Sequence, residues 1–288
     1  MTESDVRRDP APLQQRVLCL LSEWGYWGEE LVGPLEVLEG MGLTVDFATP
    51  TGKRPVALTP SMDPTYVDPP LGRSVTTQEM AAKVRALDDP SNPRLSDPID
   101  LSAWLPDYPY HSDPQYLRLT ENYYAKLGDV AEDIGRYDAL LMVGGSGPIV
   151  DLANNHRVHD LLLAFYRAGK PIAAECYAVT CLAFARDLED RASIIRGKHV
   201  TGHCKEYDYK TGTGFMGTTF QIGPPPYPLE YILRDATAPD GAYHGNYGKP
   251  TSVIVDYPFI TGRSTSDSYL TGQKLVEVLS QGLNRWGW

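Results

Sequence analysis

The chain has 288 residues, a formal net charge of −11 and 42% hydrophobic residues. This is the composition of a globular protein, which argues against a disordered or fibrous chain. Lysine and arginine form no cluster of the kind that a nucleic-acid partner requires, and no apolar run approaches the roughly 20 residues that cross a bilayer. Four cysteines are too few for a disulfide scaffold, so a reducing, cytoplasmic setting is the default expectation.

The first 15 residues are polar and include Pro10 and Pro12. They lack the apolar stretch of a signal peptide, so we expect a disordered tail ahead of a single domain at 16–288. The domain opens with an apolar strand at 16–21, an amphipathic helix at 29–41 and a second strand at 44–49. This order is typical of a βαβ unit, which implies a parallel sheet.

The α/β pattern is interrupted from about residue 50 to residue 128. Twelve of the 24 prolines lie between Pro50 and Pro114, and an X-Pro step disfavours helix at the residue before it. Helices are nevertheless expected at 76–87 and 119–134. Because Trp104 and many tyrosines do not suit a solvated linker, we interpret the segment as a large surface insertion. A flexible linker between two domains is the alternative.

The pattern then returns, and a glycine-rich loop at 144–147 follows an apolar strand. We find no internal repeat. The expected strands are 139–143, 171–175, 251–255 and 259–261, and the expected helices are 156–167, 177–185 and 267–279.

Cys176 is the main candidate for a catalytic residue. It stands between a predicted strand and a predicted helix, where a side chain is presented at the carboxyl edge of a parallel sheet. The positive end of the helix dipole should stabilise a thiolate there, as in a nucleophile elbow built on cysteine. A buried core cysteine is the structural alternative. The other three cysteines, Cys19, Cys181 and Cys204, lack this placement, although Cys204 could be a redox partner.

Glu30 is the second candidate, because it opens the first helix at the same sheet edge. A carboxyl kept neutral by poor solvation could donate a hydrogen bond to the thiolate and serve as general acid or base. Glu29 could compete for this role, and a helix-start carboxylate is the structural alternative. The loop with Gly145 and Ser146 could direct N–H groups toward an oxyanion, or be no more than a tight turn.

Five segments together resemble the ThiJ/PfpI superfamily, whose fold is related to that of class I glutamine amidotransferases. The resemblance covers about residues 16–50 and 129–281. The segments are Glu30-Leu31-Val32-Gly33-Pro34 with its following strand to Pro50, Tyr137 to Gly145, Ala173-Ala174-Glu175-Cys176-Tyr177-Ala178, Gly197 to His203, and Asp256 to Ser266.

The resemblance implies a flavodoxin-like three-layer sandwich with a mostly parallel sheet, a homodimer and a Cys176–Glu30 active pair without metal or cofactor. The larger branch with heat-shock chaperones and glyoxalase III is the most similar in plan. By carry-over, Cys176 is the nucleophile, Glu30 the acid or base and His203 a proton relay. The oxyanion site then lies near Gly145, Ser146 and Tyr177.

Two positions depart from the family pattern: Tyr177 stands where a histidine is usual, and Glu175 replaces an apolar residue. A tyrosine is a poor base at neutral pH but a hydrogen-bond donor. Glu175 should point away from Cys176 and needs a partner if buried. Trp24, Trp27 and Tyr177 flank the catalytic candidates and suit a substrate larger than methylglyoxal, or serve only as packing.

Three functions follow as hypotheses. The first is a cofactor-independent lyase or hydrolase acting on a carbonyl-type small molecule, like glyoxalase III. The second is a hydratase or hydrolase of a bulkier, aromatic metabolite or isocyanide. The third is a holding chaperone or a thiol redox sensor without turnover, which should expose an apolar patch or a thiol of low pKa.

Overall fold

The computed structural model describes residues 14–208, 214–215, 218–219 and 228–288. The tail expected at 1–15 therefore falls almost wholly outside the described residues. The strands are β1 (Arg16–Leu20), β2 (Thr44–Thr49), β3 (Ile99–Asp100), β4 (Ala139–Met142), β5 (Ile172–Glu175), β6 (His199–Val200), β7 (Gly214–Phe215), β8 (Thr218–Thr219), β9 (Ala242–Tyr243), β10 (Val253–Asp256), β11 (Phe259–Gly262) and β12 (Arg285–Trp286). The helices are α1 (Gly28–Gly40), α2 (Gln78–Asp88), α3 (Leu101–Trp104), α4 (Tyr116–Gly135), α5 (Gly147–Asp151), α6 (His156–Arg167), α7 (Val179–Phe184), α8 (Leu229–Thr237) and α9 (Ser268–Gln281).

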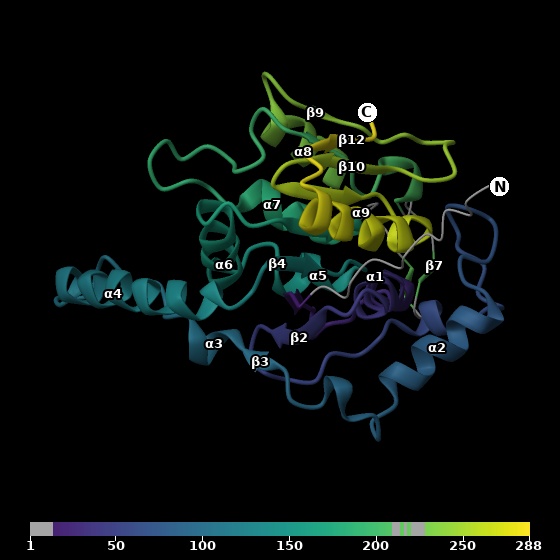
Figure 1. Ribbon diagram of the computed structural model, residues 1–288, viewed down its shortest axis with the longest axis horizontal. Helices are drawn as coiled ribbons and strands as arrows, with labels where there is room; N and C mark the ends of the chain where they lie inside the picture. Colours follow the sequence, from purple (N-terminus) through teal and green to yellow (C-terminus); the bar gives the residue numbers. More distant parts are fainter. Residues whose placement is uncertain (1–13, 209–213, 216–217, 220–227) are drawn as a thin grey trace, which may run out of the picture.

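The main sheet has eight strands in the order β12-β10-β11-β5-β4-β1-β2-β3. The strands from β11 to β3 are parallel, whereas β10 runs antiparallel to both of its neighbours. Helices cover both faces of the sheet (Figure 1). The predicted flavodoxin-like sandwich with a mostly parallel sheet is confirmed, since helical crossovers are what connect parallel strands.

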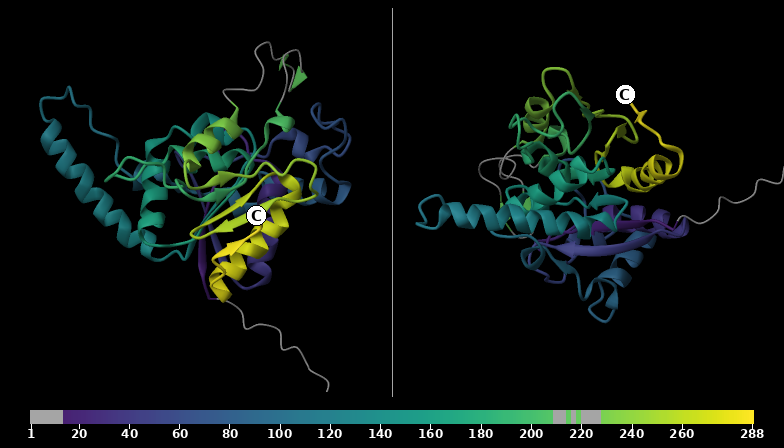
Figure 2. Two further views of the ribbon diagram at one scale, coloured as in Figure 1. Left: turned by 90° about the horizontal axis from the view of Figure 1, so that it is seen from above. Right: turned by 60° about the vertical axis from the view of Figure 1, so that its left-hand side comes forward.

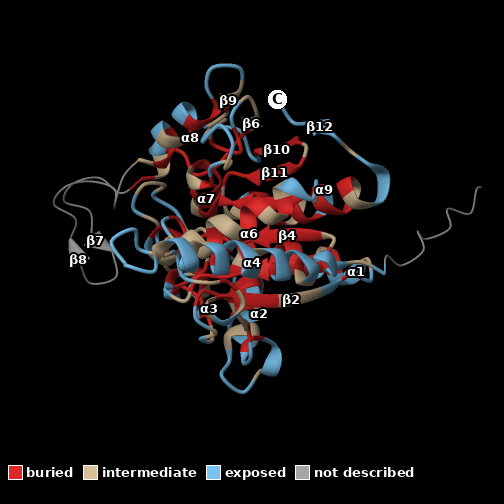
Figure 3. Ribbon diagram, turned by 90° about the vertical axis from the view of Figure 1, so that its left-hand side faces the viewer, coloured by how far each residue is buried: buried red, intermediate tan, exposed pale blue. Residues whose placement is uncertain are grey.

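Alternating side chains of the strands feed two separate cores. In β1, Val17 and Cys19 pack with α1 and α9 on one face, whereas Leu18 and Leu20 pack with α6 and α7 on the other. Both sets are fully buried, as parallel strands with two covered faces require. Figure 3 shows the buried strands enclosed between helices whose outer sides are exposed.

The segment between β2 and β4 has two parts with different positions. Its first part, including α2, lies beside α1, against which α2 packs. Its second part includes α4, which projects from the body of the protein (Figures 1 and 2). Both helices were predicted, although α2 begins at Gln78 because the Thr77 side chain caps it by accepting a hydrogen bond from the N–H of Met80.

One predicted helix, 177–185, is wrong in its first turn. Residues Cys176–Ala178 form a 3-10 turn, and α7 begins only at Val179. Cys176 has a φ of 52°, a left-handed value that cannot belong to a regular α-helix. The sequence analysis also missed α3, α5, α8 and the short strands β3, β7, β8, β9 and β12, whereas β6 lies in the segment from Gly197 to His203 that the family resemblance gave as a strand. Within the part of the chain that the structure describes, no helix has the length and hydropathy to span a bilayer.

Candidate functional site

Three loops meet at the carboxyl ends of neighbouring strands. The loop after β1 leads to Glu30 in α1, the loop after β4 contains Gly144 and Gly145, and β5 runs directly into Cys176. Because α1 covers one face of the sheet and α6 the other, the strand connections diverge between β1 and β4. In α/β proteins such a divergence leaves a crevice in which ligands bind.

The conformation of Cys176 projects its thiol into this crevice. A left-handed φ is unusual for a residue with a side chain and marks local strain of about 1–2 kcal/mol. The backbone N–H groups of Gly145 and Tyr177 both hydrogen-bond toward the thiol and lower its pKa. These are the two groups that the sequence analysis expected to form an oxyanion site.

The net effect of the site on the thiol is opposite to the expected one. Burial raises the pKa of Cys176 well above its ordinary value, and the Glu30 carboxylate raises it further. The expected stabilisation of a thiolate by a helix dipole does not prevail, because α7 has only six residues and begins after a 3-10 turn. At neutral pH the free protein therefore holds Cys176 as a thiol, and attack on a substrate requires a nearby base.

Glu30 lies against Cys176 and is almost fully buried, with 2% of its surface exposed. Burial raises its pKa to about 8, so the carboxyl is neutral at pH 7. Room for the two side chains comes from Gly144, where an added Cβ would lie 2.3 Å from Glu30 Oε2 and 2.7 Å from Cys176 Cβ. Glu29 is half-buried, and its Oε2 accepts a hydrogen bond from Thr265 instead.

His203 and Asp208 complete the group around the thiol. The Sγ atom of Cys176 lies 3.7 Å from His203 Nδ1, and His203 Nε2 lies 2.9 Å from Asp208 Oδ1. The Tyr177 hydroxyl also lies 2.9 Å from Nε2. In the tautomer with the ring proton on Nε2, that proton is donated to the Asp208 oxygen and Nδ1 is free to accept the thiol proton. This is a Cys–His–Asp arrangement of the kind that activates nucleophiles.

Tyr177, which stands at the family's usual histidine position, supports this arrangement. Its ring stacks on His203 with centroids 4.0 Å apart, and its hydroxyl donates to Asp208 at 3.2 Å. The histidine is thus supplied by a different segment of the chain. Asp208 was missed by the sequence analysis, and a carboxylate five residues after His203 was the signal available.

These residues line a cavity of about 700 Å³. All of the predicted site residues except Trp24 line it: Cys176, Glu30, His203, Gly145, Ser146, Tyr177 and Trp27. Trp24 does not: it is 69% exposed and lies outside the cavity.

Residues within 58–77 of the β2–β4 segment form one wall of the cavity, whereas α4 contributes no residue to it. Further wall residues come from 247–250 and 263–266. Tyr207 and Tyr247 also line the cavity.

Glu175 is buried at the end of β5, and its carboxyl lies near Thr271 of α9. Its neighbour across the sheet is Gly262, and a Cβ added there would lie 2.9 Å from Glu175 Oε1 and 2.5 Å from Thr271 Oγ1. Burial raises its pKa well above the ordinary value, and an ionised Glu30 raises it further. Cys19, Cys181 and Cys204 are buried in the cores and do not line the cavity.

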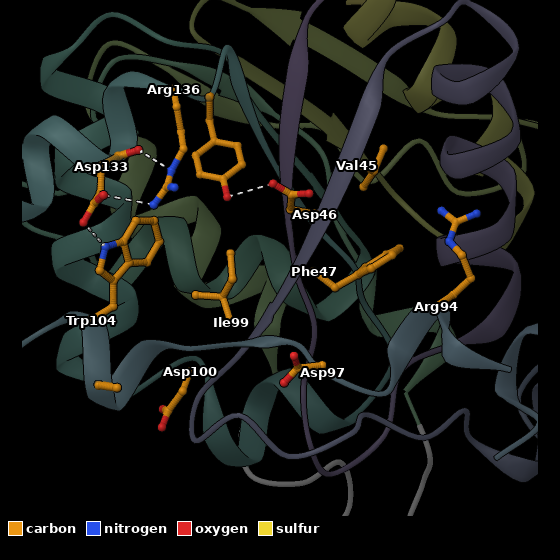
Figure 4. A pocket seen from close by; sticks show the side chains of 12 residues that line it. Val45, Asp46, Phe47, Arg94, Asp97, Ile99, Asp100, Trp104, Asp133 and Arg136 are labelled. Carbon is orange, nitrogen blue, oxygen red and sulfur yellow. Dashed lines mark hydrogen bonds and ion pairs between the residues drawn. The ribbon is translucent and has the colours of Figure 1, made fainter. Parts of the chain in front are cut away.

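A second cavity of about 650 Å³ lies beside β2 and α4 (Figure 4). Its polar side chains bind one another: Trp104 Nε1 and Arg136 both donate to Asp133, and the Tyr137 hydroxyl donates to Asp46. Asp100 caps α3 through Ser102. Since these groups already have hydrogen-bonding partners, fewer polar groups remain to bind a ligand here than in the cavity at Cys176.

Comparison of the amino-acid sequence with known proteins finds a matching family model and a relative. A family model described as ThiJ/PfpI family-like matches residues 21–211. The chain is 30% identical over 152 residues to the glutamine amidotransferase-like class 1 domain-containing protein 1 of Bos taurus. That alignment covers 53% of this chain and 63% of the relative, so the chain spans less than two thirds of the relative's length.

Comparison with solved structures finds proteins whose fold is similar to that of this chain. Rapid Encystment Protein 24 kDa of Francisella tularensis superposes with a TM-score of 0.64 at 19% identity, covering 92% of this chain and 99% of the other. Glyoxalase III of Candida albicans superposes with a TM-score of 0.61 at 16% identity, covering 91% and 96%. At such identities the likeness concerns the fold alone.

The sheet order defines a flavodoxin-like α/β protein, and a cysteine stands at the turn after β5. Because the family model matches more than half of its length, the chain belongs to the ThiJ/PfpI-like family.

Proposed function

We propose that this protein is a cofactor-independent cysteine enzyme that converts a 2-oxoaldehyde to a 2-hydroxy acid, as glyoxalase III does. The observation that carries the proposal is the series of contacts from Cys176 Sγ to His203 Nδ1 and from His203 Nε2 to Asp208. Cys176 and Glu30 line the same cavity, so a bound substrate meets nucleophile, base and acid together.

The first step forms a covalent adduct. The thiol proton moves to His203 Nδ1 while Sγ bonds to the aldehyde carbon, and the C=O electron pair moves onto oxygen. The N–H groups of Gly145 and Tyr177, which already point at the thiol, face that oxyanion. The neutral carboxyl of Glu30 gives it a proton, which yields a hemithioacetal.

The second step is an internal oxidation and reduction. Glu30, now a carboxylate, removes the proton of the former aldehyde carbon, while protonated His203 gives its proton to the neighbouring carbonyl oxygen, and an enediol forms. Glu30 then returns its proton to the adjacent carbon and takes up the hydroxyl proton of the sulfur-bearing carbon, which gives a thioester and leaves His203 neutral. One carbon is thereby oxidised by two electrons and its neighbour is reduced by two. Water, with His203 as base, then adds to the thioester and the C–S bond breaks, which restores Cys176 and releases the 2-hydroxy acid. The net change is the addition of one water.

Two features support an enzyme over the sensor or chaperone alternatives. A thiol sensor needs a thiol of low pKa, whereas burial raises the pKa of Cys176. A cavity wall at residues 58–77 also suits a small substrate better than an unfolded polypeptide. A homodimer, which the family resemblance implies, remains a proposal that sedimentation analysis can test.

The experiment compares the wild type with Cys176→Ala, His203→Gln and Cys204→Ala on methylglyoxal and phenylglyoxal, with formation of the 2-hydroxy acid as readout. We expect turnover without added cofactor, a loss of at least about 10³-fold in the first two variants and near wild-type rates in the third. Turnover that survives Cys176→Ala contradicts the mechanism. Absence of turnover in the wild type contradicts the proposed reaction and favours the chaperone alternative. Faster turnover of phenylglyoxal favours the bulkier, aromatic substrate.

A further inference from the structure

The cavity at Cys176 carries two cationic side chains on its wall that have no anionic partner. Arg73 and Lys249 both line the cavity and are exposed. Within the described part of the chain, neither side chain makes a hydrogen bond or an ion pair. The protein as a whole has a net charge of −11. Two cations without an ion-pair partner at one cavity opening therefore stand out against the negative charge of the chain.

Among the described residues, the carboxyl groups of the same cavity form no ion pair with these cations. Asp68 accepts a hydrogen bond from the N–H of Leu71, and Glu29 accepts one from Thr265. Glu30 is neutral at pH 7, since burial raises its pKa to about 8. Arg73 and Lys249 are therefore the exposed cations of this opening that have no ion-pair partner among the described residues.

The turn that carries Lys249 is held in place. The buried guanidinium of Arg263 donates to the backbone carbonyls of Asn246 and Lys249, the latter at 2.9 Å, and packs over the ring of Tyr207. A rigid turn presents its lysine to a ligand at a smaller cost in conformational entropy than a mobile loop does.

The same cavity contains hydrogen-bonding groups without partners. The indole N–H of Trp27 and the hydroxyl of Thr76 are buried and hydrogen-bond to no group in the described residues. Thr76 is only 8% exposed. Arginine, lysine and the indole N–H are donors only. The indole N–H, the Thr76 hydroxyl and the two cations are thus donors that an acceptor-rich ligand could satisfy.

From this distribution of charge and donors we infer that the substrate is a carbonyl acid, whose carboxylate binds the wall with Arg73 and Lys249 while its carbonyl carbon lies at Cys176. The inference rests on the proposed function for the carbonyl group, but not for the anionic group. The cavity of about 700 Å³ has room for such an extension beyond a three-carbon 2-oxoaldehyde.

The first test needs no turnover. Iodoacetate and iodoacetamide alkylate the same sulfur, forming an S–C bond and releasing iodide, but only iodoacetate is anionic. The ratio of their rates at Cys176, divided by the ratio for free N-acetylcysteine, cancels the thiolate fraction. We expect a normalised ratio of about ten at low ionic strength, falling at least threefold in Arg73→Gln and in Lys249→Gln. Lys53→Gln, which removes an exposed cation outside the cavity, is the matched control and should leave the ratio unchanged. A wild-type ratio near one, or equal ratios in all four proteins, overturns the inference.

The second test compares 4,5-dioxopentanoate with the neutral 2-oxopentanal as substrates. We expect at least a tenfold preference in kcat/KM for the anion, lost in Arg73→Gln and Lys249→Gln through KM with little change in kcat. Equal kcat/KM for both compounds overturns the inference and leaves the proposed reaction intact. If neither compound is turned over, the proposed reaction fails, and the alkylation ratio alone decides whether an anion site exists.

Discussion

Replacement of Glu30 by glutamine should make Cys176 ionise at a lower pH. In the wild type the Glu30 carboxyl, with a pKa of about 8, becomes anionic in the range in which a thiol normally ionises. That charge then opposes formation of a thiolate beside it, and it is the second cause of the raised pKa of Cys176 after burial. Glutamine occupies nearly the same volume but never acquires the charge.

The expected shift follows from the packing around Gly144. A Cβ there would lie 2.3 Å from Glu30 Oε2 and 2.7 Å from Cys176 Cβ, so these two atoms are at most about 5 Å apart. The thiolate charge lies on Sγ, one bond beyond Cβ, so two unit charges about 5–7 Å apart repel by about 2–3 kcal/mol at an effective dielectric constant of about 20. This corresponds to about two pKa units. Because burial remains, the pKa of the thiol should fall by one to two units and still lie above its ordinary value.

The assay is the pH dependence of alkylation of Cys176 by iodoacetamide, followed by mass spectrometry. The other three cysteines are fully buried, so the reaction reports Cys176. At pH 9 we expect the Glu30→Gln variant to react at least tenfold faster than the wild type. Glu29→Gln is the control, because it removes the adjacent carboxyl, which hydrogen-bonds Thr265 instead, and should shift the profile much less. Superimposable profiles for the wild type and Glu30→Gln would refute the coupling between the two groups.

Three further predictions concern the same site. Asp208→Asn should lower kcat on a substrate by about 10²- to 10⁴-fold with little effect on KM, because the amide NH2 can donate to Nε2 and place the ring proton on Nδ1, which then cannot accept the thiol proton; steady-state kinetics measure this. Since folding raises the pKa of Glu30 from 4.5 to about 8, its contribution to stability is full below pH 4.5 and is lost as pH rises through 8. Urea unfolding should therefore show a free energy of unfolding that falls by a few kcal/mol between pH 5 and pH 8, and falls less in Glu30→Gln; an equal fall in both proteins contradicts the assignment. Gly144→Ala should destabilise the protein by about 1–3 kcal/mol in thermal unfolding and slow alkylation of Cys176, whereas Gly128→Ala, where an added Cβ meets nothing within 4 Å, should do neither.

Local patterns in the sequence were sufficient to predict the strands and the helix that position the site. The apolar strands 16–21 and 171–175 and the helix at 29–41 follow from side-chain periodicity, which depends only on near neighbours. Because parallel strands present their carboxyl ends at one edge, Glu30 and Cys176 could be expected in one place without knowledge of the structure.

Contacts across long loops decided the rest. His203 and Asp208 lie in a segment without regular strand or helix pattern, so nothing periodic indicated that they would meet Cys176. Trp24 is close to Glu30 in sequence, yet the chain turns it outward to solvent. For the same reason, the wall that residues 58–77 form over the thiol could be stated only as a hypothesis.

The ionisation of Cys176 is the property of the site that could not be predicted from the sequence. The sequence by itself determined the fold class, the family and the position of the thiol at a strand-to-helix turn, since these depend on local geometry. Only the tertiary structure decided the protonation state of that thiol, because desolvation and the Glu30 charge outweigh the short helix and the two N–H groups. Solvation depends on everything packed around a group, and no spacing of residues along the chain encodes it directly.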